Sequence, residues 1–238
     1  MHWVTPDFGF YDWPEPKIES YRKVRRRIRE VESQTPYEEK HKKLVWRGAR
    51  GNSFRQTFLN VTEGVDWADT HDIEWHNPEM REKYLLSMSE HCRYQYVAHI
   101  SGNSWSGQGK YAHNCESVFV THETALKWTE IFTAAIEVDG EGQNVVLLHD
   151  DWDDLASTID NLMHHQPEKA RRIAKNAKDT FQDRYLTPAA EACYWRELFR
   201  QWSTISFEPN LYKEDNKTWR GTPFESVALL QKTEWEAY

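Results

Sequence analysis

Short apolar runs alternate with polar loops over residues 41–150 of the chain. Four of these runs have the length of a buried strand: 42–46 (KKLVW), 93–100 (RYQYVAHI), 117–122 (SVFVTH) and 144–149 (NVVLLH). Glycine, asparagine and serine follow the first two runs, as turn-forming residues often do at the ends of strands. The pattern therefore predicts four strands separated by loops and helices.

Apolar residues at helical spacing predict helices before, between and after these strands. The predicted helices are 17–33, 54–61, 110–115, 125–132, 151–165, 167–186 and 187–205. A polar stretch at 66–80 (DWADTHDIEWHNPEM) shows neither pattern, so we expect an irregular surface excursion there.

Strand, loop and helix in alternation, followed by further helices, favour the α/β class. We predict a Rossmann-like parallel sheet with helices on both faces. Residues 1–40 are expected to form a linking segment and a helix, 41–206 the sheet domain, and 207–238 a tail that packs back on it. A chain of 238 residues is long enough to bury such a core without metals or disulfides.

Composition narrows the class of protein. The chain holds 12 Trp, 11 Tyr and 10 Phe, yet its mean hydropathy is −0.87. No run approaches the ~20 apolar residues of a membrane-spanning helix, and we expect no signal peptide in this chain. The aromatic residues favour a packed core over sugar or base stacking. A net charge of −8 argues against a nucleic-acid partner.

Two loops follow the carboxyl ends of predicted strands, where open α/β sheets bind ligands. The first, 46–55 (WRGARGNSFR), carries three arginines whose guanidinium forks fit phosphate oxygens. The second, 102–110 (GNSWSGQGK), has small residues that let backbone N–H groups approach an anion before a helix. Together the loops predict a diphosphate site. The alternative is a plain turn beside arginines that are solvated or ion-paired.

Common nucleotide and metal motifs are not matched. The P-loop pattern G-x-x-x-x-G-K-[ST] fails because Ser104 stands at its first glycine and Tyr111 follows Lys110. The dinucleotide pattern G-x-G-x-x-G fails as well, and no catalytic triad is recognisable. The acidic run 149–154 (HDDWDD) is interpreted as capping the next helix in preference to holding a metal. Three cysteines without C-x-x-C spacing argue against zinc.

The two loops and their flanks resemble glycosyltransferase family 90. The resemblance rests on 43–59 (KLVWRGARGNSFRQTFL), 91–120 (HCRYQYVAHISGNSWSGQGKYAHNCESVFV) and 183–199 (DRYLTPAAEACYWRELF), which occur in the family's order. Two further segments, 6–16 (PDFGFYDWPEP) and 220–229 (RGTPFESVAL), are similar to its fungal branch of capsule-associated xylosyltransferase-like proteins. The family also includes animal protein O-glucosyltransferases.

The resemblance implies a GT-B enzyme, in which the C-terminal one of two Rossmann-like domains holds a UDP-sugar. This chain would be that domain with its connecting segment. UDP-glucose or UDP-xylose would be the donor and a protein or glycan hydroxyl the acceptor, with no cofactor and no required metal. The family's N-terminal domain and its catalytic aspartate have no counterpart here, so we expect incomplete activity and name no catalytic residue. The alternative is a non-catalytic interaction module that keeps the fold.

The resemblance also implies which residues bind the nucleotide-sugar. They are Arg47, Arg50, Ser53, Arg55, Asn103, Ser104, Trp105, Ser106, Gly107 and Gln108. Arg55 matches the family's diphosphate-binding arginine. Gln108 stands where the family usually has an arginine, so one charge-assisted hydrogen bond worth ~1.5–3 kcal/mol would be lost.

The resemblance also implies how the three cysteines are paired. Cys92 and Cys115 match a pair that forms a disulfide in the family, and their positions make the bond plausible. Such a bond implies the secretory pathway, in the lumen of the Golgi or endoplasmic reticulum. Cys193 matches a cysteine that pairs with the family's N-terminal region in animal members, so we expect it to be unpaired here.

Overall fold

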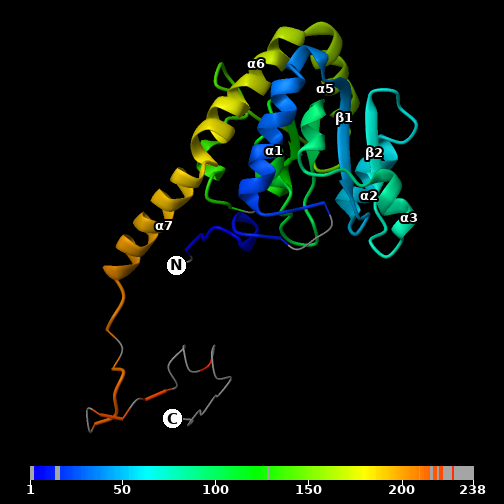
Figure 1. The fold of residues 1–238 in the computed structure, drawn as a ribbon. Helices are drawn as coiled ribbons and strands as arrows, with labels where there is room; N and C mark the ends of the chain where they lie inside the picture. Colours follow the sequence, from blue (N-terminus) through cyan, green and yellow to red (C-terminus); the bar gives the residue numbers. More distant parts are fainter. Residues whose placement is uncertain are drawn as a thin grey trace. The chain divides into compact units, whose positions relative to one another are not determined.

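The computed structural model describes residues 3–13, 17–127, 129–208, 210–214, 217–218, 220–221 and 227. The chain divides into two compact units, Met1–Trp195 and Arg196–Tyr238. The first unit holds the sheet and the helices that cover it (Figure 1). The predicted boundaries at residues 40 and 206 stay predictions, and much of the predicted tail lies outside the described residues.

The sheet of the first unit has five strands in the order β2-β1-β3-β4-β5, and every neighbouring pair is parallel. The strands are β1 (His41–Gly48), β2 (Ala68–Asp72), β3 (Tyr94–His99), β4 (Val118–His122) and β5 (Val146–Leu148). In the register, Val45 of β1 is opposite Asp69 of β2 on one side and Val97 of β3 on the other. This sheet confirms the predicted Rossmann-like α/β class, while the GT-B arrangement stays a prediction.

Seven α-helices lie before, between and after the strands in the described part of the chain. They are α1 (Tyr21–Gln34), α2 (Ser53–Val61), α3 (Pro78–Tyr84), α4 (Gly109–Ala112), α5 (Leu155–Asp160), α6 (Pro167–Ala177) and α7 (Pro188–Ser203). The 3-10 turns are η1 (Phe8–Phe10), η2 (Tyr37–Glu39), η3 (Glu90–Arg93), η4 (Glu123–Lys127) and η5 (Thr133–Ala135). π-Helical turns η6 (Asn161–His165) and η7 (Lys178–Tyr185) extend α5 and α6.

Helices cover both faces of the sheet because successive strand residues point to opposite sides. Leu44 and Trp46 of β1 belong to one apolar cluster, which includes residues of α2, α5 and α6. Val45, between them, belongs to a second cluster with residues of α1, α4 and η7. All three side chains are fully buried. Burial of each stabilises the fold by about 1.5–3 kcal/mol.

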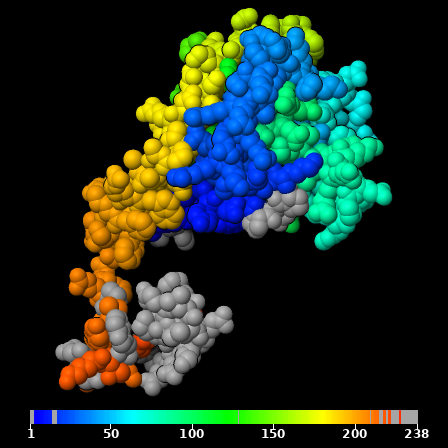
Figure 2. All heavy atoms as spheres, in the orientation of Figure 1, coloured from blue at the N-terminus to red at the C-terminus, as the bar shows by residue number. Residues whose placement is uncertain are grey.

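Helix α1 shows how a highly charged segment packs against the sheet. Val24 and Ile28, four residues apart, are buried, while most of the arginines and lysines beside them are exposed. Arg25 is the exception: its guanidinium donates to the Gln182 carbonyl at 2.6 Å and to Asn114 Oδ1 at 3.0 Å. Figure 2 shows α1, in blue, lying against the yellow residues of η7.

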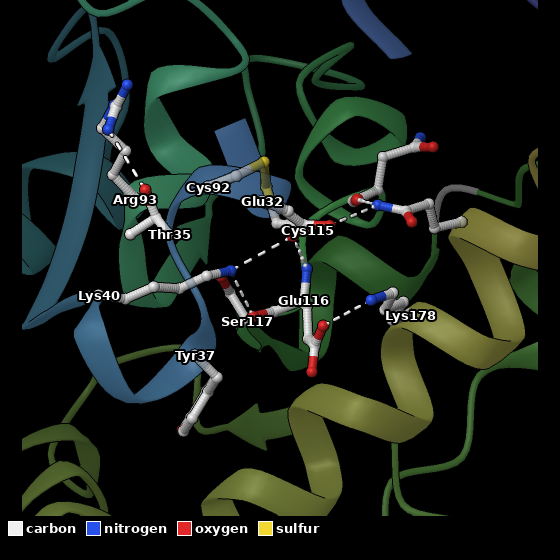
Figure 3. Close-up of polar contacts among 12 residues, drawn as sticks. Glu32, Thr35, Tyr37, Lys40, Cys92, Arg93, Cys115, Glu116, Ser117 and Lys178 are labelled. Atoms are coloured by element: carbon white, nitrogen blue, oxygen red, sulfur yellow. Dashed lines mark hydrogen bonds and ion pairs between the residues drawn. A yellow bond between two sulfur atoms is a disulfide. The ribbon is translucent and has the colours of Figure 1, made fainter. Parts of the chain in front are cut away.

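A buried polar cluster closes the amino-terminal edge of the sheet (Figure 3). Lys40, just before β1, donates through Nζ to the Glu116 carbonyl at 2.6 Å and pairs with Glu32 at 3.2 Å. Glu116 in turn pairs with Lys178 at 2.7 Å. The Lys40 side chain is only 1% exposed, so its charge must be paired in the folded chain. We interpret this cluster as structural, because it lies at the edge opposite the predicted loops.

Two segments differ from the prediction. The polar stretch 66–80 is ordered: it contains β2 and the start of α3. β2 is an edge strand whose residues are all half-buried, so it has no apolar run. Asn77 caps α3 by accepting the Met80 N–H at 3.2 Å, and Pro78 follows the cap. The predicted helix 125–132 is also wrong, because the described residues there form only the short 3-10 turn η4.

The second unit begins inside α7. Past the helix its described residues include a short turn, in which the Arg220 N–H donates to the Leu211 carbonyl at 3.0 Å. Lys213 closes the same turn with a 2.8 Å bond from its N–H to the Thr218 carbonyl. Among the described helices of the chain, none combines the length and the apolar character needed to cross a membrane.

Candidate functional site

The two predicted loops meet at the carboxyl-terminal edge of the sheet. Asn52 Nδ2 and Arg55 Nε both donate to the Ser101 carbonyl, at 2.9 and 3.1 Å. The other nitrogens of Arg55 donate to the Ala49 carbonyl at 3.0 Å and the Ile100 carbonyl at 3.3 Å. Arg55 therefore joins the loop after β1 to the loop after β3, at the edge where parallel sheets bind ligands.

The charge of Arg55 is not neutralised by an ion pair with any described carboxylate, because all its hydrogen bonds go to carbonyls. Its Cζ atom lies 5.6 Å from the centre of the Trp46 ring, a cation–π distance. Burial lowers the pKa of Arg55, yet the guanidinium stays charged, since its ordinary pKa lies above ~12. The negative charge of Asp72 acts on Arg55 in the opposite direction and raises its pKa, but the two side chains form no ion pair. An anion placed here would meet a guanidinium that no described carboxylate contacts directly.

The amino terminus of α2 adds to this positive potential. The helix begins at Ser53, which is exposed, and Asn52 caps it by accepting the Arg55 N–H at 3.0 Å. The first N–H groups of a helix carry partial positive charge and favour phosphate. Asn52 and Arg55 at this terminus both bond the Ser101 carbonyl, so the start of α2 lies against the loop after β3 at the sheet edge.

The other two predicted arginines point elsewhere. Arg47 is buried and pairs through its NH2 nitrogen with Asp69 at 2.7 Å, and its Nε donates to the Tyr84 carbonyl at 2.7 Å. Arg50 is half-exposed and pairs with Asp72 at 3.1 Å. All three guanidinium nitrogens of Arg47 already make hydrogen bonds, so a diphosphate would have to displace partners such as Asp69 to bind it, whereas Arg50 bonds Asp72 only through Nε. Their predicted role in nucleotide binding stays a prediction.

Two glycines keep the second loop close to its neighbours. A Cβ atom on Gly102 would lie 2.9 Å from the Trp105 carbonyl oxygen, and one on Gly107 would lie 2.2 Å from the Trp13 ring. A side chain at Gly107 would therefore collide with an aromatic ring. Asn103 and Ser104, between the two glycines, are exposed and Ser106 is half-buried, so these three offer polar groups at the surface of the loop.

Trp105 and Gln108 contact other elements. The Trp105 indole N–H donates to the Glu130 carboxylate, and its ring stacks on Trp13 with centres 6.3 Å apart. Gln108 stands at the cap position of α4, and its amide nitrogen lies 3.4 Å from His91 Nε2. Burial lowers the pKa of His91 to about 4, so its neutral ring accepts from Gln108. The Gln108 amide nitrogen therefore already has a partner within the chain.

A buried histidine, His122, holds the start of the loop after β3 in place. His122 Nε2 accepts the Ser101 N–H at 3.2 Å, and Nδ1 donates to Asp150 at 2.7 Å. Thr124 donates its hydroxyl to the same carboxylate at 2.6 Å. Burial opposes ionisation of Asp150, but the bonds from Thr124 and His122 lower its pKa to about 2. This chain of bonds holds Ser101, to which Arg55 and Asn52 are attached.

The acidic run 149–154 does not cap the next helix as predicted. Asp154 stands at the cap position of α5, but its carboxylate accepts the His149 N–H at 3.3 Å and makes no cap bond. In the described part of the chain, His149, Asp151 and Asp153 form one exposed group with ligand atoms within 4.8 Å of one another. Exposed acidic groups of this kind are common without a metal, so we assign none.

Cys92 and Cys115 form a disulfide, as the resemblance implied, with Cα atoms 5.0 Å apart (Figure 3). Both cysteines are buried in the cluster beneath α1. The bond ties η3 to the segment just after α4 and so brackets the second loop. Cys193 is free and exposed.

The sequence did not single out Glu130, which lies in a segment predicted to be helical, and it did not single out Asp7. Asp7 accepts from Lys110 Nζ at 2.9 Å and lies near Trp105 in the same cavity as Glu130. No local motif marks either residue. Only the packing of residues 3–13 against the second loop brings them to the site.

A protein-family model described as glycosyl transferase family 90 matches residues 2–220. The match includes both loops, the disulfide and all five strands. No curated protein matches the chain.

Proposed function

Since this chain belongs to glycosyl transferase family 90, we propose that its two loops bind the diphosphate of a UDP-sugar. The observation that carries the proposal is the position of Arg55, an unneutralised cation at the amino terminus of α2 where both loops meet. Phosphate groups favour this combination of guanidinium, helix terminus and backbone N–H groups.

The reaction would transfer a glucosyl or xylosyl group from UDP to a hydroxyl of a protein or glycan. The acceptor oxygen forms a bond to the anomeric carbon while the bond from that carbon to the β-phosphate oxygen breaks. UDP leaves with the bonding electrons, and Arg55 with nearby backbone N–H groups stabilises its charge. The acceptor proton must pass to a base, which we do not assign: Asp7, near the loop, is already paired with Lys110.

The proposal includes the secretory pathway as the location. The support is the buried Cys92–Cys115 disulfide, because such bonds persist in oxidising compartments. The donor needs no metal in this proposal, since the positive charge at the phosphate comes from the chain itself.

A non-catalytic module is the second candidate. It is favoured by Gln108, which supplies no charge, and by Arg47, whose charge is taken up by Asp69. Both observations reduce the positive charge that the loops offer to a ligand.

Calorimetric titration with UDP, UDP-glucose and UDP-xylose tests the proposal, with ADP as the comparison ligand. We expect binding of the uridine ligands and at least tenfold weaker affinity in Arg55→Ala, a loss of about 1.4 kcal/mol or more. Arg55→Lys keeps the charge, so its affinity for the uridine ligands should lie between those of the wild type and Arg55→Ala. Arg26→Ala, which removes an exposed arginine of α1, is the matched control and should bind like the wild type.

Absence of binding at millimolar UDP, in protein shown to be folded by circular dichroism, would support the non-catalytic module. Equal affinity in the wild type and Arg55→Ala would show that the diphosphate binds elsewhere.

A further inference from the structure

A cavity of about 200 Å³ lies beside the second loop. Asp7 and Phe10 line it from the N-terminal segment, Trp105 from the loop, and Glu130 from the chain after β4. Pockets for drug-sized ligands usually measure ~300–1,000 Å³. This cavity is therefore too small for a nucleotide and has the size of a ligand with a single ring.

Glu130 has an unsatisfied atom beside this cavity. Its Oε1 accepts the Trp105 indole N–H, while its Oε2 is buried and has no hydrogen-bond partner among the described residues. A buried polar atom without a partner costs about 1–3 kcal/mol. Such atoms call for an explanation in a native structure, and a hydroxyl group of a ligand would supply the missing bond.

The charges around the cavity cancel. Asp7 pairs with Lys110 at 2.9 Å, and the Lys110 side chain is fully buried. Burial raises the pKa of Glu130 to about 7, so a large share of this carboxyl is neutral at neutral pH. The cavity thus offers hydrogen-bonding groups without a net positive charge, which suits an uncharged polyol and disfavours a phosphate.

The walls match the two kinds of surface on a sugar ring. Carboxyl groups of Asp7 and Glu130 bind hydroxyls, and the apolar edges of Phe10 and Trp105 cover C–H groups. Trp105 belongs to the loop that would hold the diphosphate, so a ligand in the cavity would lie next to that group.

We propose that this cavity receives the sugar ring of the donor and that Glu130 hydrogen-bonds its hydroxyls. The inference rests on the proposed function for the identity of the attached group, the uridine diphosphate. Glu130 would then determine how strongly the sugar is preferred over UDP alone.

The test compares two affinities within each variant. We expect the wild type to bind UDP-glucose or UDP-xylose at least tenfold more tightly than UDP, and Glu130→Ala to reduce that ratio to within twofold. The ratio cancels any effect of the substitution on the loop that binds UDP. Glu130→Gln, which keeps an acceptor for Trp105, should retain part of the preference. Glu123→Ala, at an exposed glutamate of η4, should leave the ratio unchanged.

A second measurement does not depend on UDP. Saturation-transfer NMR with methyl glucoside and methyl xyloside, at tens of millimolar, should show contact with the wild type and loss of signal in Glu130→Ala. If UDP fails to bind but the glycoside signal depends on Glu130, the diphosphate site is wrong and the sugar site stands. An affinity ratio that Glu130→Ala does not change, or no glycoside signal from the wild type, would overturn the inference.

Discussion

The ammonium group of Lys110 lies 2.9 Å from a carboxylate oxygen of Asp7, although 103 residues separate the two in the chain. The Lys110 side chain is fully buried, and the ring centres of Trp13 and Trp105 each lie 5.3 Å from its nitrogen. This pair fastens the N-terminal segment to the start of α4, directly behind the second loop. We infer that the pair keeps the loop in its ligand-binding shape.

Lys110→Met should lower the free energy of unfolding by about 3–5 kcal/mol, because it leaves Asp7 without its partner. Asp7→Asn should cost a similar amount, since a buried ammonium then lacks a carboxylate. The double variant should be less destabilised than the sum of the two. Urea unfolding followed by far-UV circular dichroism gives all three values.

The matched control is the exposed pair of Arg26 and Glu30 in α1. Removing Arg26 should cost less than about 1 kcal/mol, as is usual for a surface pair. Strict additivity of the Lys110 and Asp7 substitutions would show that the buried contact contributes nothing specific.

Glu130 should give stability a distinct pH dependence. Its pKa is about 7 in the folded chain against an ordinary value of 4.5, so the folded state retains a proton that the unfolded state loses. Stability from this group is therefore fully present below pH ~4.5 and lost as the pH rises toward 7. Glutamine cannot titrate, so the Tm of Glu130→Gln minus that of the wild type should rise across this range and then level off.

Glu123→Gln, at an exposed glutamate, supplies the baseline for the same Tm series. A difference between Glu130→Gln and the wild type that stays constant from pH 4.5 to pH 8 would contradict the raised pKa of Glu130.

Arg47 should contribute to the stability of the fold and not to the affinity for UDP. Arg47→Met leaves the half-buried Asp69 carboxylate without the partner 2.7 Å away, and we expect a loss of about 3 kcal/mol in urea unfolding. UDP affinity of the folded variant should stay within threefold of the wild type. Arg50→Met, at an exposed pair, should cost less than about 1 kcal/mol. Unchanged stability with tenfold weaker UDP binding would make Arg47 a phosphate ligand.

The Cys92–Cys115 disulfide should contribute about 3–4 kcal/mol, the range expected from chain entropy for the 23 residues that separate the cysteines. A reducing agent should therefore lower the Tm of the wild type and of Cys193→Ser, in which only the exposed free cysteine is changed. The double variant Cys92→Ala/Cys115→Ala should show the lowered Tm with and without reductant. A wild-type Tm that does not respond to full reduction would argue against a stabilising bond.

Buried strands and amphipathic helices could be predicted from the sequence because their side chains repeat with the period of the element. β1 and β3 carry runs such as LVW and YVA, which are apolar because helices cover both faces of the sheet. β2 lies at the sheet edge with half-buried, polar residues, so nothing in its composition separates it from a loop. An edge strand is defined by its neighbour, which the sequence does not show.

Some features of the candidate site could likewise be predicted from the sequence, and others could not. That two loops follow adjacent strands could be predicted from the chain order, and the structure brings them together at Ser101. The distinction between Arg47 and Arg55 could not be predicted, because it depends on which one lies beside Asp69. The role of Glu130 could not be predicted from the sequence either, because its unsatisfied oxygen results from packing between distant segments.

Hydrogen exchange followed by mass spectrometry, with and without UDP, tests the central claim most directly because it locates the ligand on the chain. UDP should slow amide exchange in residues 49–55 and 100–108 and leave exchange in helix α6 unchanged. Arg55→Ala should abolish that protection at the same UDP concentration. Protection confined to other segments, or none at a concentration that calorimetry shows to be saturating, would contradict a diphosphate site between the two loops.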